Sequence, residues 1–182
     1  ASEIVVTKLK RASDLITSFK RVAVDQSNDE KHSIFISEYL NNILWSLAPK
    51  LKKTGHTVSI NCDETLKIDC FAGAFTQIFT NLIINSLLHG FENVSEGEIS
   101  IDIEQIEHDQ VMIRYHDNGK GISSEDQKKI FEPFYTTKRG HGGTGLGLHI
   151  IYNLVTQKMR GAISLESEDG QGAAFNIRLP NI

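Results

Sequence analysis

Half of the glycines in this chain of 182 residues lie in one stretch, which constrains the fold more than any other feature. Seven of the fourteen glycines fall between Gly119 and Gly147. Such a stretch is either a flexible linker or a loop whose backbone approaches a ligand closely. A linker would not hold Ile130, Phe131 and Phe134 in its middle. The sequence therefore favours a lid over a ligand-binding site.

Segments typical of helices and strands alternate around the glycine-rich stretch. Ser37 is the predicted N-cap of the first of these helices, and Gly55 is its predicted end. Because no βαβ unit repeats, we expect an α/β sandwich of the α+β kind, with a mixed, largely antiparallel sheet covered by helices on one face. The predicted strands are 33–36, 56–61, 98–103, 111–117, 162–166 and 174–179, and the helices are 37–53, 73–90 and 144–159.

The first 27 residues have a different pattern. Their apolar residues recur at alternating spacings of four and three, which is typical of a helix that packs against another helix. Fewer than four heptads are present, so the spacing also fits an ordinary amphipathic helix. The apolar residues are Val5, Leu9, Ala12, Ile16, Phe19 and Ala23.

Charge and cysteine content exclude several classes of protein. The net charge of −4 gives no reason to expect nucleic acid, which is bound by clustered Lys and Arg. Cys62 and Cys70 cannot form a disulfide framework and lack zinc-ligand spacing, so reduced thiols are expected. No apolar run approaches the roughly 18–20 residues that cross a bilayer, and no signal peptide opens the chain. We expect a soluble intracellular protein.

The glycine motifs themselves narrow the choice of ligand. The sequence has no G-x-x-x-x-G-K-[ST] loop, and its G-x-G-x-x-G match at 140–145 does not follow a strand. The segment Gly142-Gly-Thr-Gly-Leu-Gly-Leu148 instead opens an apolar helix, on whose surface we expect His149. Glycines in a first helical turn let an anion reach the free N–H groups, and phosphate is the natural guest.

A polar stripe runs along the otherwise apolar helix predicted at 73–90. Gln77, Asn81, Asn85 and His89 recur every four residues and therefore share one face. The two asparagines fit a solvent-exposed face, although Lys or Glu would suit water better. An Asn oxygen can also be one ligand of Mg²⁺, which takes the rest of its shell from water and phosphates.

An acidic residue ends the strand predicted at 111–117. Val111, Ile113 and Tyr115 are the inward residues, and Asp117 continues their row. A carboxylate there is costly unless it meets a donor. Asp117 either bonds the amides of the following turn or accepts a hydrogen bond from the amine of a ligand at the floor of a pocket.

Four motifs appear in series between residues 77 and 148. They are the Asn-rich box Gln77-x-x-x-Asn81-Leu-Ile-Ile-Asn85-Ser86, the first glycine box Asp117-Asn-Gly119-Lys-Gly121-Ile122, the phenylalanine box Ile130-Phe-Glu-Pro-Phe134-Tyr135 with Thr136-Thr-Lys138, and the second glycine box 142–148. Together they closely resemble the ATP-binding catalytic domain of bacterial sensor histidine kinases, members of the gyrase, chaperone and mismatch-repair ATPase superfamily. The resemblance covers residues 34 to 180.

The resemblance implies a Bergerat-type ATP-binding fold with ATP and Mg²⁺ as cofactors. Asn85 would hold Mg²⁺ against the triphosphate with support from Asn81. Asp117 would accept a hydrogen bond from the adenine amino group, which favours adenine over guanine. Gly119 and Gly121 would let the base lie against the backbone.

The same resemblance implies roles in ligand binding for several other residues. His89 would pack on adenine, Phe131 and Phe134 would anchor the lid, and Lys138 and Arg139 would reach the phosphates. The implied cofactor-binding residues are Asn81, Asn85, His89, Asp117, Gly119, Gly121, Ile122, Phe131, Phe134, Lys138, Arg139, Gly143, Thr144, Gly145, Leu146, Gly147 and Leu148, with Asn85 as the metal ligand.

Two positions depart from the family pattern. Leu88 stands where family members often have Lys or Arg, which leaves open a nucleotide-sensing or scaffolding module without transferase activity. Asn81 stands where hydrolytic relatives have a Glu that activates water. Since Asn is a poor general base, an ATP-hydrolysing machine of the chaperone or gyrase kind is disfavoured, and no residue is predicted to be the catalytic base.

The resemblance implies a histidine kinase core of a two-component system. In that family the phosphorylated histidine lies on a dimerising helical hairpin, whereas the first histidine here, His32, follows the heptad helix and lacks a following acidic residue. We therefore expect residues 1–27 to be the end of the hairpin's second helix, without the phosphoacceptor helix. Residues 31–182 would form the catalytic domain, with the lid at about 119–146.

The implied partners follow from that organisation. They are the missing phosphoacceptor helix, a second copy in a homodimer of the full-length protein, and the receiver domain of a response regulator. The full-length protein would be cytoplasmic or anchored to the inner membrane.

Overall fold

The structure, a computed structural model, describes residues 30–106, 109–137 and 145–180. The helix predicted at 1–27 lies outside these ranges and stays a prediction. Within these ranges, no helix is both long enough and apolar enough to span a bilayer.

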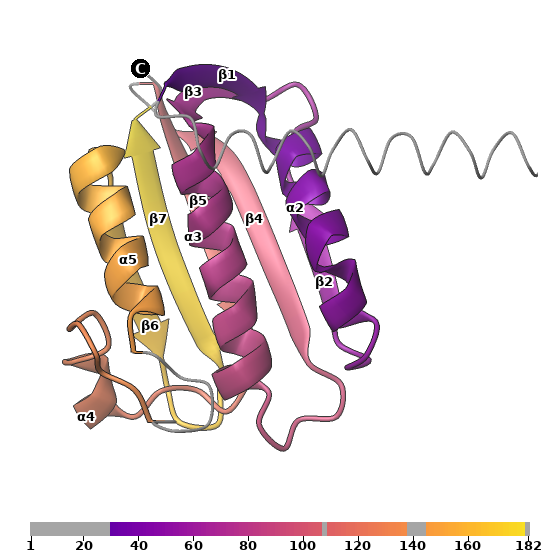
Figure 1. The fold of residues 1–182 in the computed structure, drawn as a ribbon, viewed down its shortest axis with the longest axis vertical. Coiled ribbons are helices and arrows are strands. Elements are labelled where there is room, and N and C mark those ends of the chain that lie inside the picture. Colours follow the sequence, from indigo (N-terminus) through magenta and orange to yellow (C-terminus); the bar gives the residue numbers. More distant parts are fainter. Residues whose placement is uncertain (1–29, 107–108, 138–144, 181–182) are drawn as a thin grey trace, which may run out of the picture.

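A five-stranded sheet forms one layer of the fold (Figure 1). Its strand order is β2-β4-β5-β7-β6. The β2–β4 pair is parallel, and the other three pairs are antiparallel, so the expected mixed, largely antiparallel sheet is confirmed. The strands are β2 (Thr57–Asn61), β4 (Glu98–Ile106), β5 (Gln110–Asp117), β6 (Ala162–Ser167) and β7 (Ala173–Pro180).

Helices cover one face of this sheet, as Figure 1 shows. The central one is apolar on its inner side, where Phe75, Phe79 and Ile83 are at most 1% exposed. Burial of each such side chain contributes roughly 1.5–3 kcal/mol, so packing against the sheet holds the helix in place. The helices are α2 (Ile36–Leu51), α3 (Ala72–Asn85) and α5 (Gly147–Asn153), with the one-turn helix α4 (Ser124–Gln127) beside the sheet.

Two helices continue into wider, π-helical turns rather than ending where the α-helix ends. α3 continues as η1 (Ser86–Gly90), and α5 continues as η2 (Leu154–Lys158). In η1 the amide of Phe91 donates to the carbonyl of Ser86 at 2.8 Å. Single π-helical turns occur often at functional sites, and η1 carries part of the predicted polar stripe.

The sequence prediction missed a second, two-stranded sheet. β1 (Lys31–Phe35) pairs antiparallel with β3 (Lys67–Phe71). Ile68 and Cys70 are buried between exposed neighbours in β3, so the alternation is present but only two residues long.

The predicted N-cap of α2 is wrong. The helix begins at Ile36 and its N-cap residue is Phe35, so Ser37 lies inside the first turn. The amide of Ile36 donates to the carbonyl of Leu66 at 3.1 Å. The backbone before β3 therefore supplies an acceptor for the first amide of the helix, and no side chain caps it.

The central strand of the large sheet, β5, ends in a buried acidic residue. In β5, Val111, Ile113 and Tyr115 are fully buried, and Asp117 at its end is 4% exposed. Asp117 is register-paired with Ile99 on one side and Ala173 on the other. The predicted continuation of the buried row into Asp117 is confirmed.

The β6–β7 turn contains a matched pair of glycines that tests how this end of β5 is packed. Gly170 and Gly172 both have φ of +78°, but a Cβ on Gly172 would lie 1.9 Å from the Asp117 carbonyl oxygen, whereas one on Gly170 would meet nothing within 4 Å. Gly170→Ala should cost only the left-handed backbone strain, about 1–2 kcal/mol. Gly172→Ala must also displace the end of β5. Urea denaturation should show a clearly larger loss of unfolding free energy for G172A; equal losses would contradict this packing.

Candidate functional site

The site is built around the buried carboxylate of Asp117. Its Oδ2 atom accepts a hydrogen bond from the Ser86 hydroxyl at 2.6 Å, and its Oδ1 atom accepts one from the Gly119 amide at 3.0 Å. The turn-amide bond that the sequence allowed is therefore present, but it occupies a single oxygen. A carboxylate has about four lone-pair positions, so Asp117 keeps acceptor capacity beyond these two bonds.

Ser86 connects Asp117 to a second buried polar group. The Tyr115 hydroxyl lies 2.8 Å from the Ser86 Oγ atom. Ser86 is 3% exposed and Tyr115 is fully buried. Burial raises the pKa of the Tyr115 phenol well above its usual range, and the negative charge of Asp117 adds to the rise. Tyr115 is therefore a neutral phenol that can donate a hydrogen bond.

Glycines bring the end of η1 against the turn that follows Asp117. A Cβ on Gly119 would lie 2.6 Å from the Gly90 carbonyl oxygen, and one on Gly90 would lie 3.3 Å from Asp117 Oδ1. The amide of Lys120 donates to the same Gly90 carbonyl at 2.9 Å. Gly121, at φ +75°, would place a Cβ 2.0 Å from the Glu168 carbonyl oxygen. These glycines are thus required by packing within the protein, independently of any base beside them.

Asn85 lies against the start of α5. A Cβ on Gly147 would lie 3.3 Å from the Asn85 Oδ1 atom, so the first helical residue leaves room for the carboxamide. The Asn85 Nδ2 atom is buried and has no hydrogen-bond partner in the described part of the chain. An unpartnered buried donor is costly, which points to an acceptor outside the described part of the chain.

The other members of the polar stripe lie along the same helix with graded exposure. Gln77 is exposed, whereas Asn81, Asn85 and His89 are half-buried. Asn81 and Asn85 share α3, one turn apart, whereas His89 lies in the π-helical turn η1. The expected single α-helix to Gly90 is thus corrected: its last turn is wider, which changes the direction of His89 relative to an ideal four-residue spacing.

The first part of the lid is held by a few contacts. Ile130 is buried, and the Phe131 ring packs on Tyr152 with a centroid distance of 5.3 Å. The Ile122 amide donates to the Ser167 hydroxyl at 2.9 Å. The Tyr135 hydroxyl donates to the Asp126 carboxylate.

Phe134 does not anchor the lid by burying its ring. Its side chain is 63% exposed, and its backbone has φ of +65°. A Cβ on Gly145 would lie 2.4 Å from the Phe134 carbonyl carbon. The backbone at Phe134 therefore meets the backbone at Gly145, and the anchoring role expected of the Phe134 side chain stays a prediction.

His149 is half-buried and joins the lid to α5, in contrast to the expected surface position. Its Nδ1 atom lies 2.9 Å from the Phe131 carbonyl oxygen, and its Nε2 atom lies 3.0 Å from Asn153 Nδ2. Since a carbonyl can only accept, Nδ1 carries the proton in this arrangement, and Nε2 accepts from Asn153. A histidine inside an apolar helix gave no sequence signal for this link.

Some predicted site residues cannot be placed. Lys138, Arg139, Gly143 and Thr144 lie outside the described residues. The remaining members of the second glycine box, residues 145–148, form the entry to α5, where the Ile150 amide donates to the Leu146 carbonyl at 2.9 Å.

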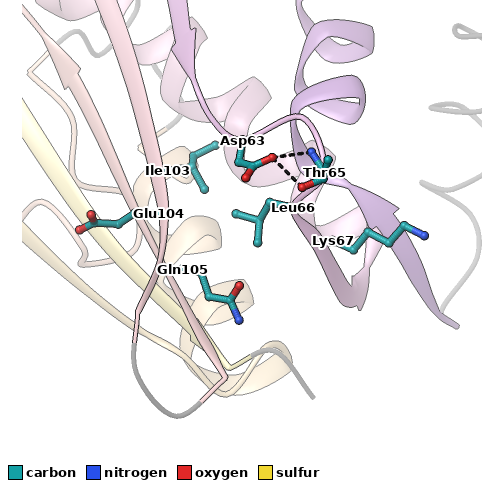
Figure 2. Close-up of a pocket in the computed structure, with 7 residues that line it drawn as sticks. All are labelled: Asp63, Thr65, Leu66, Lys67, Ile103, Glu104 and Gln105. Atoms are coloured by element: carbon teal, nitrogen blue, oxygen red, sulfur yellow. Dashed lines mark hydrogen bonds between the residues drawn. The ribbon is translucent and has the colours of Figure 1, made fainter.

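A cavity of about 380 Å³ lies elsewhere on the molecule, between the start of β3 and the far part of β4 (Figure 2). Asp63 at its rim accepts bonds from the amide and hydroxyl of Thr65, both at 2.7 Å. Ile103 of the cavity lies four residues along β4 from Ile99, the partner of Asp117, or about 13 Å away. No predicted site residue lines this cavity, so it is separate from the candidate site. Its lining residues are Asp63, Thr65, Leu66, Lys67, Ile103, Glu104 and Gln105.

Comparison with known proteins identifies the family. Residues 72–182 match the family described as histidine kinase-, DNA gyrase B- and HSP90-like ATPase. The chain belongs to this family. It is 30% identical over 181 residues to sporulation kinase E of Bacillus subtilis, covering 97% of this chain and 23% of that protein. It is 40% identical over 121 residues to the sensor histidine kinase ZraS of Salmonella typhimurium, covering 66% of this chain and 25% of that protein.

Solved structures of histidine kinases share the fold of this histidine kinase-type ATPase. The catalytic domain of histidine kinase ThkA has a TM-score of 0.72 and 26% identity, with 84% of this chain and 96% of that chain covered. The fold class and the ATPase family predicted from the motifs are therefore confirmed. The chain spans about a quarter of the length of the two curated relatives above.

In this histidine kinase-type ATPase, we expect the Tyr135–Asp126 bond to make lid anchoring pH-dependent. The bond lowers the pKa of the Asp126 carboxyl and raises that of the Tyr135 phenol. Its stabilisation is therefore present above the ordinary carboxyl pKa and is lost as pH falls through the lowered value; at the alkaline end it is lost as pH rises through the raised phenol value.

Hydrogen exchange of the amides in 130–135 measures this anchoring. We expect their protection factors to be highest near neutral pH and to fall in acid. Asp126→Asn should remove the acid dependence, and an unchanged acid response in that variant would refute the assignment.

Proposed function

We propose that this chain is the kinase core of a two-component sensor, which binds Mg²⁺-ATP and transfers the γ-phosphoryl group to a histidine on a dimerisation helix. A response regulator's receiver domain would then take the phosphoryl group. The observation that carries the proposal is the meeting, at one end of α3, of a buried acceptor and a buried donor that has no partner among the described residues. Asp117 supplies the acceptor and Asn85 the donor.

The acceptor end suits adenine. An ionised carboxylate only accepts hydrogen bonds, and the exocyclic group of adenine is an amine that donates. The corresponding group of guanine is a carbonyl, which would face Asp117 with no proton between them. His89, half-buried one turn beyond Asn85, is the ring that would pack on the base.

The other end suits a phosphate with its metal ion. The Asn85 carboxamide and the glycine opening of α5 lie together, and the first amides of a helix bind anions. The described part of the chain has no group of three or more His, Cys, Asp or Glu side chains arranged to hold a metal ion. A hard cation with one Asn ligand would complete its shell with water and phosphate oxygens, as Mg²⁺ does, and would neutralise phosphate charge when bound. The residues present therefore fit Mg²⁺ at the Asn85 Oδ1 atom, and the Nδ2 donor would be left to meet a phosphate oxygen.

Transfer fits the site better than hydrolysis. Asn81 stands one turn before Asn85 on α3, and its carboxamide cannot take a proton from water. Phosphoryl transfer needs mainly positioning and charge neutralisation from the protein, so the acceptor histidine can bring its own nucleophile. Residues 1–27 as the hairpin's second helix, 31–182 as the catalytic domain and 119–146 as the lid remain part of this proposal.

The transfer is tested by supplying the missing hairpin. Incubation of this chain with γ-labelled ATP, Mg²⁺ and a separate hairpin that carries the acceptor histidine should give acid-labile, base-stable label on the hairpin. A hairpin with that histidine changed to Gln is the matched control. Steady release of inorganic phosphate, at a rate that does not depend on the hairpin, would instead favour a hydrolase.

A second candidate function rests on Leu88, whose side chain is 42% exposed where family members often have a cation. A nucleotide-sensing module without transferase activity would bind ATP through Asp117 but transfer nothing. Tight ATP binding with no phosphohistidine in the same assay would support this module and contradict the kinase.

The metal assignment makes its own prediction. Asn85→Ala should weaken ATP binding by at least about tenfold in the presence of Mg²⁺, the size of one lost contact to a charged group, and much less in EDTA. Asn41→Ala is the control, because Asn41 is an exposed helical asparagine bonded to the Ser37 carbonyl. Titration calorimetry that shows equal losses with and without the metal would contradict a metal-binding role.

A further inference from the structure

Three buried polar side chains form a continuous chain of hydrogen bonds behind the carboxylate. The Tyr115 hydroxyl lies 2.8 Å from Ser86 Oγ, which lies 2.6 Å from Asp117 Oδ2. Their residues are at most 4% exposed. Buried polar groups of this kind are costly unless all are paired, and here each has its partner.

The direction of the bonds is fixed by counting protons. Ser86 has one hydroxyl proton, which it donates to the Asp117 carboxylate. Its oxygen can then only accept from Tyr115, whose phenol stays protonated because burial raises its pKa. The order is therefore Tyr115 to Ser86 to Asp117, with both donors pointing toward the carboxylate.

This series of hydrogen bonds fixes the orientation of the Asp117 carboxylate. Ser86 holds Oδ2 from the helix side, and the Gly119 amide holds Oδ1 at 3.0 Å from the turn. Because its two oxygens are held by separate elements, η1 and the turn after β5, the carboxylate has little freedom to rotate. The lone pair that remains on each oxygen is then fixed in direction, and these are the positions that can accept from a ligand.

We propose that Ser86 and Tyr115 are specificity-determining positioning residues, which orient Asp117 as an acceptor and thereby set the preference for a 6-amino over a 6-oxo purine nucleotide. The inference rests on the proposed function, since it concerns the base that Asp117 meets. Neither residue touches the nucleotide in this assignment: both act through Asp117.

The base specificity is measured by titration calorimetry with ADP and GDP, and the phosphate end by tripolyphosphate. Ser86→Ala should weaken ADP binding about tenfold, the size of a lost bond to a charged group, with GDP and tripolyphosphate binding unchanged, so that the ADP-to-GDP preference falls about tenfold. Tyr115→Phe should lower the preference less, about threefold. The double variant should be no worse than Ser86→Ala alone, because the tyrosine acts through the serine.

Two matched controls remove the same groups elsewhere. Ser59→Ala deletes a hydroxyl that donates to the Ile99 carbonyl at 3.3 Å. Tyr39→Phe deletes a buried phenol hydroxyl 3.1 Å from Thr76 Oγ1. Both should leave the preference unchanged. If Ser86→Ala lowers stability enough to obscure binding, Tyr115→Phe keeps the ring in the core and gives the answer alone.

The outcomes separate this inference from the proposed function. If the wild type binds ADP and Asp117→Asn loses it, while Ser86→Ala and Tyr115→Phe keep the full preference, the positioning role is overturned and the nucleotide site stands. Equal weakening of ADP, GDP and tripolyphosphate would also overturn it, because that is the result of a merely structural role. If Asp117→Asn binds ADP as tightly as the wild type, the proposed function and this inference both fail.

Discussion

A carboxylate that ends the central strand of an apolar sheet must find donors, and the site is organised by that requirement. Asp117 occupies a position where the alternation of β5 would otherwise place another apolar side chain. Leu or Ile there would pack without any polar partner, whereas the carboxylate must be solvated by protein groups. Ser86 and the Gly119 amide supply the hydrogen-bond donors that a carboxylate in this apolar row requires. Such conflicts with the local pattern are expected at functional sites.

The floor of the site and its lid are held in different ways. Around Asp117, backbone segments approach so closely that side chains are excluded, as between Gly90 and Gly119 or between Gly172 and the strand end. Over the lid, the described contacts are a few side-chain bonds and one buried apolar residue, Ile130. The floor is therefore fixed by backbone packing, whereas the described part of the lid is held by side chains.

The large sheet and its helices could be predicted because, in a long amphipathic segment, the spacing of apolar residues shows which face is buried. Asp117 could be placed by the same alternation. The two-stranded sheet was missed because β3 shows only two inward residues. The N-cap at Ser37 was wrong because the helix begins one residue earlier, at Ile36, whose amide donates to the Leu66 carbonyl. The exposure of the Phe134 ring could not be predicted, since hydrophobicity alone cannot distinguish a buried ring from an exposed one. No role was predicted for Ser86 beyond its place in the Asn-rich box, because its partners Tyr115 and Asp117 lie 29 and 31 residues away in the sequence.

Asn85 and Ser86 are adjacent, yet they serve opposite ends of the candidate site. Successive residues of a helix point about 100° apart, so Asn85 reaches the start of α5 while Ser86 reaches β5. α5 is in turn bonded to the lid through His149 and the Phe131 carbonyl. The end of α3 thus contacts Asp117 and the start of α5, and it is linked to the lid through α5. Since a misplacement of about 1 Å can cost a hundredfold in rate, a small shift of this one helix end would alter all three together.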